Sequence, residues 1–205
     1  STTPVTITSR RVRHGTSTAS IAVATSLRRR DASGNGSSSL VIGLRNPKHE
    51  QRVAATLSAD IAKSGLANPP RLASANLKPR LRMATLYYFA NTLGYMVVGT
   101  GNRSEWYVGY STKYGDGGVD VQPIIGLLKS EVVELARHLG VPEEIIVKPP
   151  TAGLWQGQTD EGEMGFTYAQ LDRYIATGVA DEQVKARIDS MHKSSRHKFA
   201  LAPTP

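Results

Sequence analysis

A glycine-rich turn that leads into a carboxylate is the most chemically suggestive segment of this sequence. In "VVGTGNRSE", residues 97–105, an apolar run ends at Gly99, Thr100 and Gly101, and Glu105 follows. Glycines at such a turn leave backbone N–H groups able to face an anion, and a carboxylate beside bound phosphates commonly shares a magnesium ion with them. The segment therefore indicates a phosphate and magnesium site. A Glu105 that only caps a short helix fits the local pattern equally well.

Two further loops carry side chains that bind nucleotides. The turn "TKYGDGGVD", residues 112–120, presents Lys113, Asp116 and Asp120, and its glycines allow a tight reversal. A lysine can pair with phosphate and an aspartate can accept from ribose hydroxyls, although a solvated turn has the same composition. A second long loop without helical periodicity covers residues 148–165, and loops of that length inside a compact domain are usually functional.

Strands alternating with helices should position these loops. Short strands are expected at residues 5–8, 40–43 and 95–98, each bounded by turn residues. Helical patterns cover a segment around Ile21 and Leu27, residues 53–62 before Gly65, and residues 77–93 before Gly94. Ser130 and Gly140 bracket another helix as N-cap and stop, a capping box at Thr167 and Gln170 opens the next, and residues 184–191 form the last. We predict a doubly wound α/β fold with a mainly parallel sheet and ligands at the carboxyl ends of its strands.

The composition limits the class of protein. The sequence has 205 residues, of which 40% are hydrophobic and 20% charged, as in a globular protein with one domain over residues 1–205. It has no cysteine, which excludes disulfides, thiolate metal ligands and a cysteine nucleophile within these residues. No apolar run reaches the roughly 18–20 residues that a membrane span needs.

The net charge of +8 comes from the first third of the sequence. Residues 1–75 hold 11 Lys or Arg against 3 Asp or Glu, whereas residues 76–205 hold 14 of each. A basic segment rich in Ser and Thr at residues 1–30 is compatible with a transit peptide, a nucleic-acid-binding arm or a solvated, phosphate-facing region. We favour the last interpretation and expect no nucleic-acid partner. Since no apolar segment precedes a small-residue cleavage site, we expect a cytoplasmic protein.

Several blocks of the sequence resemble one family closely. They are "NLKPRLRM…LYYFAN", "VVGTGNRSE", "VGYSTKYGDGGVDVQPI", "LLKSEVVELARHLGVPEEIIVKPPTAGLWQGQTDEGEMGFTY" and "SSRHK", in order and with the family's spacing over residues 76–198. The family is ammonia-dependent NAD synthetase, with a fold of the adenine nucleotide alpha-hydrolase type. The resemblance implies that ATP adenylates the carboxylate of nicotinic acid adenine dinucleotide (deamido-NAD) and that ammonia then displaces AMP. It also implies Mg²⁺, a cytoplasmic homodimer and a cleft completed by the second subunit.

The same resemblance assigns roles to individual residues. Glu105 matches the magnesium ligand, and Lys129 and Thr151 match ATP contacts that we expect to carry catalysis. The other ATP contacts are matched by Ser17, Arg45, Gln51 and Thr100. The contacts to deamido-NAD are matched by Arg80, Lys113, Asp120, His197 and Lys198.

Residues 1–75 depart from the family pattern. The expected pyrophosphatase loop, Ser-Gly-Gly-x-Asp-Ser, is replaced by "RHGTSTASIAVATSL", which keeps only Gly15-Thr16-Ser17 of the lead-in. Two explanations compete: the protein is a weak or inactive nucleotide-binding homologue, or the sequence omits loop residues. The stretch from Gln51 to Asn76 is also far shorter than in the family. The second explanation is favoured, because both missing pieces face phosphate or substrate in the family. Since the 205 residues contain no cysteine and no room for a glutaminase domain, we expect free ammonia as the nitrogen source.

Overall fold

The structure, a computed structural model, describes residues 70–202 and several shorter pieces of the first third. These pieces are Ser20–Ile21, Ala24–Leu27, Ser38–Val41, Leu44–Arg45, Leu57, Ala59, Asp60, Ile61, Lys63 and Gly65. The chain divides into two compact units, one made of Ser1–Gly99 with Tyr114–Gln122 and the other of Thr100–Lys113 with Pro123–Pro205. The prediction of a single domain over residues 1–205 stays a prediction.

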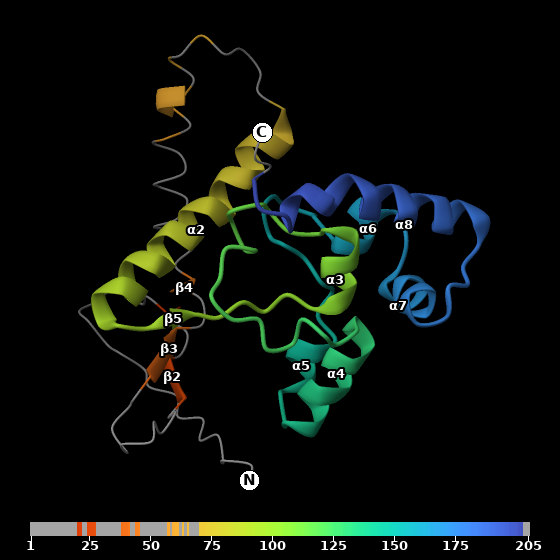
Figure 1. Ribbon diagram of the computed structural model, residues 1–205, viewed down its shortest axis with the longest axis horizontal. Coiled ribbons are helices and arrows are strands. Elements are labelled where there is room, and N and C mark those ends of the chain that lie inside the picture. The colour runs from red at the N-terminus through yellow and green to blue at the C-terminus, as the bar shows by residue number, and fades with distance from the viewer. Residues whose placement is uncertain are drawn as a thin grey trace. The chain divides into compact units, whose positions relative to one another are not determined.

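A long helix is the main described element of the first unit. Helix α2 spans Arg71–Leu93 and ends at Gly94, which adopts φ 67° and donates its N–H to the Ala90 carbonyl (Figure 1). The left-handed conformation at Gly94 is the one that glycine adopts without steric cost. The predicted end of this helix is therefore confirmed. The helix begins earlier than predicted, at Arg71, and it continues through Pro79.

The strands of the first unit form two small sheets. Strand β5 (Met96–Val97) pairs in parallel with β3 (Ser38–Val41), and β3 pairs antiparallel with β2 (Ala24–Leu27). Strand β1 (Ser20–Ile21) pairs antiparallel with β4 (Leu44–Arg45). The expected strands at residues 40–43 and 95–98 are therefore present, shifted by one or two residues. The expected strand at residues 5–8 lies outside the described part.

The helix predicted around Ile21 and Leu27 is wrong, because both residues lie in strands. In "SIAVATSL" the β-branched residues Ile21, Val23 and Thr25 recur at every second position, which favours an extended chain over a helix. The mainly parallel sheet stays a prediction, since the described pairings include both directions. The helical pattern before Gly65 is confirmed where the structure describes it, at Leu57, Ala59, Asp60 and Ile61, and Gly65 follows with φ 79°.

Residues 114–122 pack against the end of β5. The N–H of Gly99 donates to the Val121 carbonyl at 2.8 Å, and the N–H of Asp120 donates to the Val97 carbonyl at 2.9 Å. A Cβ atom at Gly99 would lie 2.8 Å from Val119 Cγ2, so this glycine is needed for close packing within the protein. In the turn at residues 112–120, Tyr114 adopts the left-handed conformation, with φ 59°.

The described part of the second unit is helical. It contains α3 (Arg103–Val108), α4 (Lys129–His138), α5 (Glu143–Ile146), α6 (Asp160–Met164), α7 (Tyr168–Thr177), α8 (Glu182–Ser195) and a 3-10 helix, η1 (Arg196–Lys198) (Figure 1). Its core consists of buried side chains from α3, α6, α7 and α8 and the connecting segments, namely Val108, Met164, Phe166, Tyr168, Leu171 and Ile188. Burial of these apolar faces holds the four helices together.

Local capping explains where two of these helices begin. Thr167 accepts from the N–H of Gln170, and the Gln170 side chain accepts from the N–H of Thr167, as the predicted capping box requires. Asn102 and Glu105 form the same reciprocal arrangement at the start of α3. The last predicted helix, at residues 184–191, is confirmed and extends from Glu182 to Ser195.

Helix α4 begins differently from the prediction. Its N-cap residue is Leu128, and Ser130 lies inside the first turn, so the assignment of Ser130 as N-cap is wrong. Tertiary contacts, and not the local sequence, bind the N–H groups of its first turn. The N–H of Ser130 donates to the carboxylate of Asp172 at 2.8 Å, and the N–H of Lys129 donates to Ser104 Oγ at 3.0 Å. Gly140, with φ 72°, follows the helix as predicted.

The C-terminal end of α3 packs very closely against α8. Gly109 ends α3 with φ 63°, and a Cβ atom built on it would lie 2.1 Å from Ser195 Cβ. Gly178 ends α7 with φ 73°, yet a Cβ atom there would meet nothing within 4 Å. The two positions share a backbone conformation and differ in the space beside it.

Gly109→Ala should therefore destabilise the protein more than Gly178→Ala. Both variants place an alanine in the left-handed region, which costs about 1–2 kcal/mol, and only Gly109→Ala adds an overpacking cost of about 1–3 kcal/mol. Urea unfolding followed by circular dichroism would measure the difference. Equal losses of stability in the two variants would contradict the close α3–α8 packing.

Candidate functional site

The residues expected to bind substrates fall into both units. The first unit contains Arg45, Arg80 and Asp120, and the second contains Thr100, Glu105, Lys113, Lys129, Thr151, His197 and Lys198. Ser17 and Gln51 lie outside the described residues, as does the side chain of Arg45. The basic segment at residues 10–30 is described only in the backbone of β1 and β2, so its predicted role stays untested.

Glu105 and Lys129 form an ion pair in the second unit. Lys129 Nζ donates to Glu105 Oε1 at 3.0 Å, and the two side chains are 23% and 20% exposed. Glu105 Oε2 accepts from the N–H of Asn102 at 3.3 Å, which completes the capping box of α3. The cap and the ion pair thus use different oxygens of one carboxylate. The local sequence was compatible with two roles for Glu105, a helix cap and a magnesium ligand. The structure shows the helix cap.

Tyr168 connects this ion pair to a second carboxylate. Its hydroxyl lies 2.9 Å from Asp160 Oδ2 and 3.4 Å from Glu105 Oε1, and Lys129 Nζ lies 4.8 Å from the centre of its ring. Tyr168 and Asp160 are both buried. Burial, followed by the charges of Glu105 and Asp160, raises the pKa of Tyr168, so its hydroxyl remains a hydrogen-bond donor at neutral pH.

Asp160 has an unusual environment for a carboxylate. It is 5% exposed, and within the described part of the chain its Oδ1 atom has no hydrogen-bond partner. Burial raises its pKa, an effect that the hydrogen bond from Tyr168 and the charge of Lys129 oppose. Nearby, Glu163 accepts hydrogen bonds from Tyr110 and from Gln158 Nε2. Burial and the bond to Glu163 raise the pKa of Tyr110. Acidic and aromatic side chains therefore line one side of the Glu105–Lys129 pair.

Sequence reasoning did not select Asp160, Tyr110, Tyr168 or Asp172 as site residues. The available signal was the density of acids in "QTDEGEMG", inside the long loop that was expected to be functional. For Tyr168 and Asp172 there was no separate signal, because an aromatic and an acid at helical spacing are common on any amphipathic helix.

The C-terminal residues of the second unit are attached to the end of α3. Lys198 Nζ donates to the carbonyls of Gly109 and Ser111, at 2.7 Å each. Lys113 Nζ donates to the carbonyl of His197 at 2.6 Å. The structure therefore brings Lys113, His197 and Lys198 together, and both lysines make backbone contacts there. Their binding of deamido-NAD stays a prediction. The His197 side chain is exposed.

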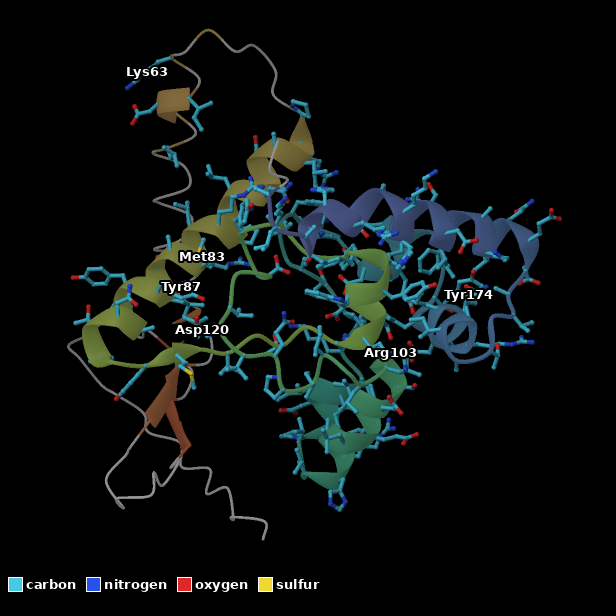
Figure 2. The ribbon with its side chains drawn as sticks, viewed as in Figure 1. Lys63, Met83, Tyr87, Arg103, Asp120 and Tyr174 are labelled. Carbon is cyan, nitrogen blue, oxygen red and sulfur yellow. The ribbon has the colours of Figure 1, made fainter. Side chains whose placement is uncertain are left out.

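The predicted contacts of the first unit lie around α2 and β5. The carboxylate of Asp120 accepts from the Tyr87 hydroxyl at 2.9 Å and from the N–H of Val97 at 2.7 Å (Figure 2). Burial, and then the hydrogen bond to Asp120, raises the pKa of Tyr87 to about 12. Arg80 is exposed on α2. The two remaining predicted ATP contacts, Thr100 and Thr151, are exposed residues of the second unit, and Thr151 Oγ1 accepts from the N–H of Gly153.

A metal site must be judged by the donors present. Among the described residues there is no group of three His, Cys, Asp or Glu side chains able to hold a metal ion. Magnesium is commonly held by one or two carboxylates together with substrate phosphates and water. A single carboxylate, Glu105, beside a lysine that can contact phosphate fits that pattern.

The described helices include none that is long and apolar enough to cross a membrane.

Comparison with known proteins identifies the family. The family model described as NAD synthase matches residues 33–202. The chain belongs to the NAD synthase family. The resemblance found in the sequence is therefore confirmed. The matched range begins after Gly15–Ser17, so the divergent segment in place of the pyrophosphatase loop lies outside it.

Two curated relatives are named NH3-dependent NAD+ synthetase. The protein from Carboxydothermus hydrogenoformans is 56% identical over 137 residues, which are 67% of this chain and 56% of the relative. The protein from Mesoplasma florum is 58% identical over 135 residues, which are 66% of this chain and 55% of the relative. The aligned part of the chain thus spans little more than half the length of these relatives.

Solved structures in the family have a similar fold. NMN synthetase from Francisella tularensis superposes with a TM-score of 0.68 at 36% identity, covering 81% of this chain and 77% of that one. NAD+ synthetase from Burkholderia pseudomallei gives a TM-score of 0.58 at 35% identity, covering 74% of this chain and 58% of that one. The chain therefore has the α/β fold of NAD synthetases, which is of the adenine nucleotide alpha-hydrolase type.

Proposed function

We propose that this protein catalyses the ATP-dependent amidation of deamido-NAD with ammonia, giving NAD, AMP and pyrophosphate. Membership of the NAD synthase family and the names of the curated relatives support this reaction. The structural observation that carries it is the 3.0 Å pair of Glu105 and Lys129, two residues assigned to magnesium and ATP. Both are shielded from solvent enough for their charges to act strongly on a nucleotide.

The reaction requires activation of a poor electrophile. A carboxylate resists attack by ammonia until one of its oxygens is converted into a good leaving group, which adenylation accomplishes. We assign Lys129 and Thr151 to the ATP phosphates, where the ammonium of Lys129 offsets the charge that develops on departing pyrophosphate. The remaining ATP contacts are assigned to Ser17, Arg45, Gln51 and Thr100, and the deamido-NAD contacts to Arg80, Lys113, Asp120, His197 and Lys198.

Glu105 is the residue that would hold magnesium. A bound Mg²⁺ would supply further positive charge at the phosphate oxygens. The capping hydrogen bond to Asn102 N–H orients the Glu105 side chain, and its other oxygen, Oε1, faces Lys129. Lys129 can therefore neutralise the charge of Glu105 and also contact a phosphate bound next to Glu105.

Free ammonia is the proposed nitrogen source. The 205 residues contain no cysteine, so they hold no cysteine nucleophile that could release ammonia from glutamine. The curated relatives are named as NH3-dependent enzymes, which supports the same choice.

An assay with ATP, magnesium, deamido-NAD and ¹⁵N-ammonium tests the function directly. We expect ¹⁵N-labelled NAD to form together with AMP in equal amounts, and no NAD when glutamine replaces ammonium. Nicotinic acid mononucleotide should be run in parallel, because the chain also resembles NMN synthetase from Francisella tularensis in fold. Turnover of the mononucleotide alone would reassign the substrate, and binding of ATP with no turnover of either acid would instead favour an inactive homologue.

We also propose that the protein is a homodimer with a doubly wound, mainly parallel sheet. Helix α2 supports the dimer, since Tyr88 and Phe89 are 68% and 41% exposed on it, and solvent-exposed aromatic residues are frequent at interfaces. Analytical ultracentrifugation at micromolar concentration should give the mass of a dimer. In contrast, a Tyr88→Lys variant with Phe89→Lys should sediment as a monomer. A stable wild-type monomer would refute the dimer.

Glu105→Gln should reduce adenylation while leaving the fold intact. Glutamine at this position of a capping box still accepts from the N-cap N–H, so α3 should form normally. An amide oxygen is a weaker ligand for magnesium than a carboxylate, and the adenylation rate should fall by about tenfold or more, equivalent to roughly 1.4 kcal/mol.

The measurement is pyrophosphate release as a function of magnesium concentration, with thermal melting as the control. Added magnesium should recover part of the lost rate. Near-native turnover in a stable Glu105→Gln protein would remove Glu105 from the metal site. A lower melting temperature with an unchanged rate per folded molecule would reduce its role to the helix cap.

A further inference from the structure

One face of helix α7 contacts both members of the Glu105–Lys129 pair and the segments that carry them. Tyr168 and Asp172 lie four residues apart on α7, so their side chains share one side of the helix. Both are buried, at 6% and 7% exposure. The roles assigned above for adenylation do not include either residue.

Tyr168 acts on the side chains of the pair. Its ring lies beneath the Lys129 ammonium, 4.8 Å from its centre, and its hydroxyl lies 3.4 Å from Glu105 Oε1. The hydroxyl is itself held at 2.9 Å from Asp160 Oδ2. Two of its contacts therefore restrict where the Lys129 and Glu105 side chains meet.

Asp172 contacts the neighbours of the pair in the same two segments. Its carboxylate accepts a hydrogen bond from Ser104 Oγ through one oxygen and from the N–H of Ser130 through the other. Ser104 Oγ in turn accepts from the N–H of Lys129. Ser104 precedes Glu105 and Ser130 follows Lys129, so one carboxylate ties together the residues on either side of the pair.

The cost of burying the Asp172 carboxylate indicates that it positions the start of α4. A buried carboxylate is costly unless it is paired or accepts hydrogen bonds from well-placed donors. Among the ion pairs of the described residues, none includes Asp172. Its charge is offset by the two donors and by the positive N-terminal end of α4. The first turn of α4, which carries Lys129, thus depends on Asp172 for its position.

We propose that Tyr168 and Asp172 are positioning residues that hold Lys129 against Glu105 in the geometry used for adenylation. The proposal rests on the proposed function, since it assigns these two residues a role in the same site. It predicts that the location of the Lys129 side chain, and not only the stability of the fold, changes when the contacts of α7 are removed.

The position of Lys129 can be measured without any substrate. Protons that lie over an aromatic ring are shifted upfield, so the ε-methylene protons of Lys129 should carry an upfield shift from Tyr168 in nuclear magnetic resonance spectra. Tyr168→Leu should abolish the shift and thereby assign it. Asp172→Asn should move the resonance towards the value of an unstructured lysine. Ser104 and Ser130 donate to different oxygens of Asp172, and an amide has an acceptor at only one of these two positions.

The same helix offers a matched control. Figure 2 shows Tyr174 on α7. Tyr174 also donates its hydroxyl to an aspartate, Asp189 Oδ1 at 2.6 Å, but none of its described contacts reaches Glu105 or Lys129. Tyr174→Phe therefore removes a tyrosine–carboxylate bond from α7 and should leave the Lys129 resonance unchanged. If Asp172→Asn does not fold, Ser104→Ala takes its place, because it removes the hydroxyl that joins Asp172 to the N–H of Lys129.

Turnover gives the second readout. In Asp172→Asn and Tyr168→Phe, kcat should fall by about tenfold, while the KM for deamido-NAD stays within about twofold and Tyr174→Phe keeps the wild-type rate. An unmoved Lys129 resonance in folded Asp172→Asn, or in Ser104→Ala, would overturn the proposal whatever the rates are. If the resonance moves but wild-type protein amidates no substrate, the positioning of Lys129 stands and the proposed function fails.

Discussion

The carboxylate of Asp172 is the contact on which the geometry of the second unit depends most. It is buried and joins α7 to the start of α4 through the N–H of Ser130 and to the start of α3 through Ser104. Each helix N-terminus has N–H groups without intrahelical partners, and burial makes leaving them unpaired costly. One side chain meets this need at α4 and at the same time fixes the distance between two helices. The proximity of Glu105 and Lys129 follows from that constraint.

Close packing imposes a second constraint, at the other end of α3. Gly109 lets Ser195 of α8 approach within a distance that no other residue would allow, and Lys198 donates to the carbonyls of Gly109 and Ser111 just after α3. Helix α3 is therefore fixed at its N-terminus by Ser104 and at its C-terminus by η1. A short helix held at both ends is a rigid support for Glu105, because neither end can fray without breaking a buried contact.

The parts of this structure that could be predicted from sequence are those with local causes. The glycine that ends α2 and the reciprocal bonds of Thr167 and Gln170 involve residues within a few positions of each other, and both predictions are confirmed. Ser130 was predicted wrongly because it lies inside the first turn, where its N–H donates to Asp172, 42 residues further along the chain. The segment from Ile21 to Leu27 has both helical and alternating character, and pairing with β3 and β4 decides in favour of strands. The site residues came from family resemblance, whereas Tyr168 and Asp160 become visible only when folding places them beside Glu105.

The capping box of α3 also explains how Glu105 can serve both the fold and the chemistry. A carboxylate has two oxygens and about four acceptor positions. The N–H of Asn102 uses Oε2, which restricts the side-chain rotamer, and Oε1 is left for Lys129. The capping hydrogen bond therefore already orients the Glu105 side chain for binding a cation. A glutamate elsewhere on α3 would lose side-chain entropy on binding a cation, since nothing would hold it beforehand. Local helix capping thus lowers the cost of organising the site.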